Sequence, residues 1–222
     1  MKDYTIEVDF QMKNRTLYSA TTWAGYIGIL TGIRPHCFSV SINYRLLNKS
    51  RFNNILKTLT LSWPVSYAVR HALESCYSYE TAVEYFKKVP LISPVYITVC
   101  GVKKNEGCLI TRNPEKTEHF ISLDNLQSEE DSKLIYLAKD LGFILQTNCD
   151  WWLVENINDD DTIMSSRKRV ESAIKSFKEL NSIDEEEIAN TIFLKPPIVN
   201  QLTIYITAMC PKNGYISARL SI

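Results

Sequence analysis

The sequence has little glycine and no clustered cysteines. Only 7 of its 222 residues are glycine, and none of them forms a Gly-rich loop leading into a helix, so a phosphate-binding loop is not indicated. The 6 cysteines are widely spaced without a Cys-x-x-Cys pair, and only 3 histidines are present, which argues against a zinc site. We therefore expect neither a metal nor a cofactor.

The sequence also has no formal net charge at pH 7. The 25 Lys and Arg residues balance the 25 Asp and Glu residues, so no basic field favours nucleic acid and no polybasic patch favours a membrane surface. The longest apolar runs, such as 96–102 and 202–209, have the length of strands and fall far short of the roughly 20 residues of a membrane helix. The N-terminus lacks the pattern of a signal peptide. These features predict a soluble protein, which we expect to form a single domain over residues 1–222.

Hydrophobic periodicity predicts a mixture of strands and helices. Ile6, Val8, Phe10 and Met12 alternate with polar residues, as in a strand with one buried face. Similar reasoning predicts β segments at 15–22, 26–30, 37–45, 95–102, 107–111, 119–123 and 142–146, helices at 65–73, 79–88, 126–141, 166–180 and 182–190, and a hairpin of 202–209 with 215–222. This order favours a layered α+β fold over a doubly wound one.

Several side chains have specific local expectations. Ser78 should cap the helix that follows it, and 182–185 has the form of a capping box. Free cysteine is commonly buried as a small hydrophobe, and we expect this of the strand residues Cys100, Cys108 and Cys210. Two triplets match the N-glycosylation signal, beginning at Asn14 and Asn48.

A set of short motifs occurs along the chain in one characteristic order. The motifs are Val8-Asp9-Phe10, the Gly-Tyr-x-Gly-x-x-Thr-Gly block at 25–32, Asn43-Tyr44-Arg45, Trp63-Pro64-Val65-Ser66, 107–113, Gln146-Thr147-Asn148, and 195–200 leading into 202–205. In this order they resemble the β-subunit of the acid ceramidase family, which includes N-acylethanolamine-hydrolysing acid amidase.

The resemblance implies a four-layer αββα N-terminal nucleophile hydrolase fold, incomplete at its N-terminus in this chain. It also implies a lysosomal or secreted enzyme that hydrolyses a lipid amide, either N-acylsphingosine or an N-acylethanolamine, with a possible α-subunit and peripheral contact with lipid. The block at 195–203 favours the ceramidase, whereas 34–36 and 172–175 lean toward the ethanolamide amidase. The ceramidase leads narrowly.

The resemblance assigns roles to two polar residues. Asn148 matches the asparagine that donates to the oxyanion, and Arg169 matches an active-site arginine at a helix start, because Ala173 anchors the match and favours Arg169 over Arg167. Tyr44 stands where the family has a glutamate, so a carboxylate that would pair with a nearby arginine is lost.

The family's nucleophile is an N-terminal cysteine in a segment that precedes Tyr4 in alignment, and it has no counterpart among these residues. Cys149 does not replace it, because an internal cysteine lacks the α-amine that serves as the base, and the adjacent Asp150 would raise its pKa. A dyad of His36 and Cys37 is disfavoured, since neighbours on a strand point to opposite faces.

Aromatic residues are candidates for contact with an acyl chain. Trp23, Tyr26 and Trp63 are open to this role, with core packing as the default for Tyr26, but Trp151 and Trp152 follow the Asn148 block directly and are better candidates, together with Tyr44. The chain is thus either a fragment of an acid ceramidase-like amidohydrolase, inactive by itself, or a non-catalytic relative that keeps the lipid-binding shell.

Overall fold

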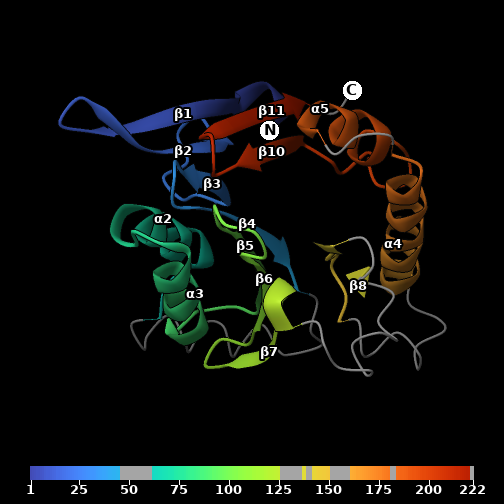
Figure 1. The fold of residues 1–222 in the computed structure, drawn as a ribbon, viewed down its shortest axis with the longest axis horizontal. Helices are drawn as coiled ribbons and strands as arrows, with labels where there is room; N and C mark the ends of the chain where they lie inside the picture. The colour runs from blue at the N-terminus through green and yellow to red at the C-terminus, as the bar shows by residue number, and fades with distance from the viewer. Residues whose placement is uncertain (46–61, 126–136, 139–141, 151–160, 181–183, 221–222) are drawn as a thin grey trace.

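A seven-stranded antiparallel sheet lies at the centre of the structure (Figure 1). The computed structural model describes residues 1–45, 62–125, 137–138, 142–150, 161–180 and 184–220. The strands pair in chain order, so each folds back on the one before it. They are β1 (Thr5–Met12), β2 (Arg15–Trp23), β3 (Thr31–Arg34), β4 (Phe38–Tyr44), β5 (Val95–Cys100), β6 (Gly107–Arg112) and β7 (Thr117–Ser122).

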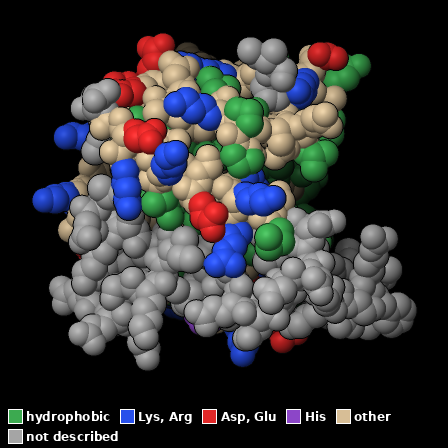
Figure 2. All heavy atoms as spheres, turned by 90° about the vertical axis from the view of Figure 1, so that its right-hand side faces the viewer, with side chains coloured by type: hydrophobic (Ala, Val, Ile, Leu, Met, Phe, Trp, Pro, Cys, Tyr) green, Lys and Arg blue, Asp and Glu red, His purple; other side chains and the backbone are tan. Residues whose placement is uncertain are grey.

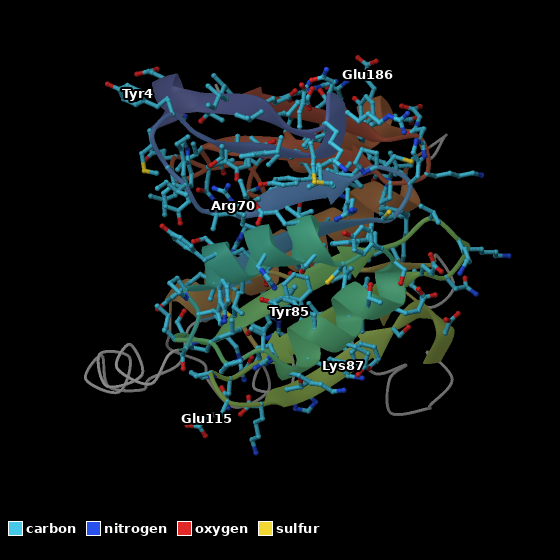
Figure 3. The ribbon with its side chains drawn as sticks, turned by 90° about the vertical axis from the view of Figure 1, so that its left-hand side faces the viewer. Tyr4, Arg70, Tyr85, Lys87, Glu115 and Glu186 are labelled. Carbon is cyan, nitrogen blue, oxygen red and sulfur yellow. The ribbon has the colours of Figure 1, made fainter. Side chains whose placement is uncertain are left out.

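Two helices, α2 (Val65–Ser75) and α3 (Tyr79–Lys88), cover one face of this sheet (Figures 1 and 3). As expected, Ser78 caps α3, and its hydroxyl accepts a hydrogen bond from the Thr81 amide. Figure 3 shows Tyr85 where the two helices meet, and its ring centroid lies 5.5 Å from that of His71 on α2. The main hydrophobic core lies between these helices and the sheet.

The other face carries two smaller layers. The first consists of two hairpins, β8 (Leu137–Ala138) with β9 (Phe143–Ile144) and β10 (Tyr205–Cys210) with β11 (Tyr215–Leu220). The second consists of α4 (Asp161–Lys178), α5 (Glu185–Ile188) and the π-helical turn η6 (Ala189–Phe193). Short 3₁₀ turns, η1 (Lys2–Tyr4) and η2 (Leu123–Asn125), complete the elements. The elements therefore form four layers in the order αββα, as the resemblance implies.

Buried arginines join the helical layer to the sheet. Arg112 of β6 donates to the carbonyls of Phe86 and Val89, the latter over 2.7 Å, and so caps the C-terminal end of α3. The partial negative charge at a helix C-terminus suits a cation. Burial nevertheless lowers the pKa of Arg112 to about 10. Arg34 of β3 caps the C-terminal end of α2 in the same way, by donating to the carbonyl oxygen of Leu73 over 2.8 Å.

The structure corrects three expectations about secondary structure. Residues 26–30 form a loop, and the next strand begins only at Thr31. The reason is tertiary, because Ile29 donates its amide to Ser66 of α2 over 3.0 Å instead of to a neighbouring strand. The helix expected over 126–141 is wrong at 137–138, which form strand β8, while its other residues lie outside the described part. The short helix is capped by Asp184, which accepts from Glu187; Ser182 lies outside the described residues.

Two further expectations about side chains were wrong. Cys108 is buried as predicted, but Cys210 is only half-buried and Cys100 is exposed, and all 6 cysteines are free thiols. Tyr26 lies at the surface instead of in the core, with its hydroxyl 2.8 Å from that of Ser66.

One face of the molecule is described by its charged side chains. Figure 2 shows acidic and basic side chains interspersed on the face formed by α4 and the C-terminal elements. None of the helices in the described ranges is long and apolar enough to cross a membrane.

Candidate active site

A buried arginine organises the end of the large sheet. Arg45 follows β4, and its guanidinium donates two hydrogen bonds of 2.7 Å to the two carboxylate oxygens of Asp150. The Tyr96 hydroxyl of β5 donates to the same carboxylate over 2.5 Å. A bidentate pair of this kind is both strong and directional. It ties the segment around 146–150 to the end of β4.

Two further groups complete the surroundings of Arg45. Glu118 of β7 forms a second ion pair with the guanidinium, and Asn113 accepts a hydrogen bond of 3.0 Å through its side-chain oxygen. Burial opposes the charged form of Arg45, but the hydrogen bonds that it donates to Asp150 and Glu118 outweigh this effect and raise its pKa. Arg45 therefore stays charged across the acidic and neutral range. Tyr44 in place of glutamate does not leave this arginine without a carboxylate.

Asn148 is held at both ends of its side-chain amide. Its nitrogen donates to the carbonyl oxygen of Tyr44 over 2.9 Å, and its oxygen accepts from Arg169 over 3.0 Å. The structure thus brings the two candidate catalytic residues into direct contact. One N–H of the amide is used by Tyr44, and an amide has two. Among the described residues, no acceptor is bonded to the second N–H.

Arg169 reaches this position from the middle of α4. It also donates to the buried Ser166 hydroxyl one turn earlier, over 3.0 Å. Burial lowers its pKa, and the neighbouring Cys149 acts in the opposite direction. The apolar contacts of Val170 with Leu145 and Ile174 fix the helix against the segment that leads into Asn148. Helix packing therefore decides which arginine reaches the site.

Arg167 lies elsewhere on the same helix. It is paired with Glu171 over 3.4 Å, with both side chains substantially exposed to solvent. A three- or four-residue spacing aligns side chains along a helix, but a two-residue spacing places them about 200° apart. The geometry therefore agrees with the choice of Arg169 over Arg167 as the residue that meets Asn148.

The chain is similar over nearly its whole length to known proteins. No family model matches it. The N-acylethanolamine-hydrolyzing acid amidase of Caenorhabditis elegans is 34% identical over 213 residues, which covers 95% of this chain and 54% of the relative. The acid ceramidase of Mus musculus is 29% identical over 224 residues, covering 99% of this chain and 52% of that protein.

A solved structure of the C. elegans N-acylethanolamine-hydrolyzing acid amidase ortholog matches with a TM-score of 0.73 and 34% identity. The match covers 95% of this chain and 82% of the solved chain. This chain belongs to the acid ceramidase and N-acylethanolamine acid amidase family. It spans about half the length of the curated relatives that it matches.

The other candidate residues of this family member make no described side-chain contact with Asn148. The Tyr44 side chain is 66% exposed, so within the described part it meets the site through its backbone carbonyl. Trp23 and Tyr26 pack against each other near the start of α2, and Trp63 packs against His71. The described residues do not include Trp151, Trp152 or Asn48.

The remaining predictions concern glycosylation, nucleophiles and metals. Asn14 is exposed in the turn between β1 and β2. His36 lies in a turn with a φ of 61°. Its Nδ1 lies 3.1 Å from the carbonyl oxygen of Lys212, so the contact described for its ring is with the backbone and not with a thiol. No group of three or more potential metal-binding side chains occurs in the described ranges.

Sequence reasoning missed the residues that surround Arg45. Arg45 belongs to one of the recurring blocks and Asp150 lies two residues after another, but the sequence did not show that they pair. Tyr96 lies within the strand β5 and Glu118 within the strand β7, and no motif marks either residue. The available hint was that Arg45 directly follows a strand, because an arginine that becomes buried there requires a charged partner.

Proposed function

We propose that this family member forms the Asn148 side of the active site of a lipid amidohydrolase. The leading substrate class is N-acylsphingosine, whose amide bond would be hydrolysed to sphingosine and a fatty acid. N-acylethanolamines are the alternative, and the 34% identity to the C. elegans amidase supports them at least as well as the 29% identity to mouse acid ceramidase supports ceramide. The observation that carries the proposal is the orientation of the Asn148 amide.

Asn148 would act as an oxyanion donor. When a nucleophile attacks an amide carbonyl, negative charge develops on the oxygen, and donors already fixed in direction stabilise it most. Contacts with Tyr44 and Arg169 hold the Asn148 amide at both ends, so little reorientation would be needed during reaction. The N–H that Tyr44 does not use is the proposed donor.

Arg169 would have two effects. Its hydrogen bond keeps the Asn148 oxygen away from the substrate, because that oxygen already accepts from the guanidinium. Its positive charge, held in a half-buried environment, would also favour the negative charge of the tetrahedral intermediate. Arg45 touches neither group and would act as a positioning residue through Asp150.

We further propose that the 222-residue chain is inactive by itself. Family resemblance assigns the attack to an N-terminal cysteine whose own α-amine is the base, and these residues contain no aligned counterpart. Cys149 is buried within a segment held by Arg45 and Asp150, and it lacks an α-amine. A non-catalytic relative that binds lipid amides is the alternative from another functional class.

The resemblance also supports an acidic, lysosomal or secretory setting with a possible α-subunit and lipid at the periphery. The names of the relatives describe acid enzymes. Asn14 is exposed, as glycosylation in the secretory route requires.

Binding and turnover of fluorescent N-acylsphingosine and N-acylethanolamine by the purified chain at acidic pH test these proposals. We expect saturable binding without turnover, and the tighter ligand identifies the substrate class. Hydrolysis that survives both Cys37→Ala and Cys149→Ala would contradict the proposed inactivity. Absence of binding by both lipids, in a protein that is folded by circular dichroism, would remove the lipid-amide assignment.

A further inference from the structure

The segment that carries Asn148 is irregular. Residues 145–150 follow strand β9 and belong to no helix or strand, and the chain bends at 148 and 149. Among the described residues, Gln146, Thr147 and Asn148 take part in no backbone–backbone hydrogen bond. In a helix or strand, such bonds would fix the direction in which a side chain leaves the backbone. Here the direction of the Asn148 side chain must come from other contacts.

The end of β4 attaches this segment to the sheet. Asn43 donates its side-chain N–H to the Gln146 carbonyl oxygen over 3.4 Å, and the Tyr44 carbonyl oxygen accepts from Asn148 over 2.9 Å. The buried ion pair of Arg45 secures the far end of the segment. Three consecutive positions at the end of the strand therefore contact every second position of the segment. None of these contacts bonds the backbone carbonyls on either side of Asn148.

The Gln146 side chain bonds those two carbonyls. Its Nε2 donates to the carbonyl oxygen of Thr147 over 3.1 Å and to that of Cys149 over 3.0 Å. A side-chain amide nitrogen carries two N–H groups, so both are used. The two acceptors belong to the residues directly before and directly after Asn148. Gln146 therefore holds the backbone on both sides of the candidate oxyanion donor.

Burial makes these two hydrogen bonds costly to lose. Thr147 and Cys149 are each only 6% exposed, and a buried carbonyl oxygen that loses its donor carries a penalty in free energy. The Oε1 atom of Gln146 is also buried and has no hydrogen-bond partner among the described residues. A reversed amide would place this oxygen against two carbonyl oxygens, which have no proton to donate. The segment thus uses the nitrogen end of the Gln146 amide.

The two bonds act on the peptide planes next to Asn148. A peptide group is planar, so a hydrogen bond that fixes its carbonyl also fixes its N–H. The Thr147 carbonyl belongs to the peptide that enters Asn148, and the Cys149 carbonyl belongs to the peptide that leaves the next residue. With both planes held, the backbone at Asn148 has little freedom to turn. The contacts with Tyr44 and Arg169 then hold the Asn148 side-chain amide itself.

We propose that Gln146 is a positioning residue for Asn148. Its amide fixes the bend from which the Asn148 side chain projects, and it acts through Asn148 without contact with the reacting atoms. Donors stabilise an oxyanion best when their direction is set before the reaction. The catalytic meaning of this inference rests on the oxyanion role proposed for Asn148. The orientation itself is measured without any substrate.

Nitrogen relaxation in nuclear magnetic resonance of the 222-residue protein tests the proposal. Loss of the signal in Asn148→Ala identifies the Asn148 side-chain amide. Its order parameter should be near the value of a rigid backbone, about 0.85, in the parent and below about 0.6 in Gln146→Met, which has a side chain of similar length without an N–H. Gln11→Met makes the same change at an exposed position of β1 and should leave the signal unchanged.

Gln146→Glu adds a readout that a role in packing alone would not give. An ionised carboxylate has no proton to donate, whereas a protonated carboxyl group has one. The two carbonyl oxygens disfavour the ionised form and raise the pKa of the introduced carboxyl above its ordinary value of about 4.3. The order of the Asn148 amide should therefore be low near pH 8 and recover in part near pH 4. The parent and Gln146→Met, measured at both pH values, control for other groups that titrate.

The side-chain amide of Asn113 reports on general loosening, because it is held by Arg45 and Glu118 in the same protein. A rigid Asn148 amide in Gln146→Met overturns the proposal, and so does an equal loss of order at Asn113. If Gln146→Met does not fold, Gln146→Glu decides, and equal order of its Asn148 amide at both pH values overturns the proposal. Unchanged hydrolysis by Asn148→Ala would remove the oxyanion role without altering these signals, so the two failures are distinguishable.

Discussion

Arg169 donates a hydrogen bond of 3.0 Å to the side-chain oxygen of Asn148, although the two residues stand 21 positions apart. The contact orients the amide, since the oxygen faces the guanidinium and the nitrogen faces the Tyr44 carbonyl. Arg45 and Asp150 secure the same segment from the sheet side. The candidate site therefore depends on two supports, one from the end of β4 and one from α4.

Arg45→Met should strongly destabilise the protein. It leaves the buried carboxylate of Asp150 without its cation, and removing one partner of a buried pair costs about 3–5 kcal/mol. Arg167→Met is the matched control, because its exposed pair with Glu171 is worth about 0.5 kcal/mol. Urea unfolding followed by circular dichroism measures both. Equal losses for the two variants would contradict the importance assigned to the buried pair.

Asn148→Ala should lower turnover by about 100-fold or more once a cysteine-bearing N-terminal segment is restored, the scale for losing one oxyanion donor. Folding should change little, because Asn148 is only half-buried. Steady-state kinetics with a fluorescent lipid amide measures the effect. Asn190→Ala is the control, since its side chain bonds only Arg219 among the described residues and should leave the rate unchanged. An active Asn148→Ala enzyme would exclude the oxyanion role.

Arg169→Met should also reduce kcat of the restored enzyme, through loss of positive charge and of the Asn148 orientation. Arg169→Lys should recover only part of the rate, because an ammonium group cannot reach both Asn148 and Ser166 in the same planar geometry. Arg167→Met again serves as the control on the same helix. If Arg167→Met lowered kcat more than Arg169→Met, the assignment of the active-site arginine would have to be exchanged.

Cys108 should make stability depend on alkaline pH. Burial raises the pKa of its thiol from 9.0 to about 11, despite an opposing hydrogen bond from Tyr79. Between these values the unfolded chain loses the proton and the folded chain keeps it, so the free energy of unfolding falls as pH rises. The expected contribution is about 2–3 kcal/mol, since one pKa unit is worth about 1.4 kcal/mol.

Urea unfolding near pH 8 and pH 10.5 of the parent and of Cys108→Ala measures this contribution. The alanine variant should show the smaller decline across that interval. Val99→Ala, at the paired position on β5, is also buried but carries no titratable group. It should lower stability equally at both pH values. The same decline in all three proteins would exclude Cys108 as the source.

Local sequence patterns were sufficient for much of the fold. Alternation predicted the strand β1, although Ile6 and Met12 of its expected buried face are exposed. The hydroxyl of Ser78 predicted the start of α3, and Asn213-Gly214 predicted the turn between β10 and β11. These signals work because strand alternation, helix capping and tight turns depend on residues only a few positions apart. Recurring blocks also identified the family, and with it the layered fold.

The tertiary structure alone decided the contacts between distant segments. Arg45 meets Asp150 and Glu118, 105 and 73 positions away, because sheet pairing and the packing of 146–150 place all three at one end of the sheet. The same kind of long-range packing turned 26–30 into a loop against α2 and left Cys100 exposed. Register and layer stacking arise from many weak contacts across the whole chain, and no short segment encodes them.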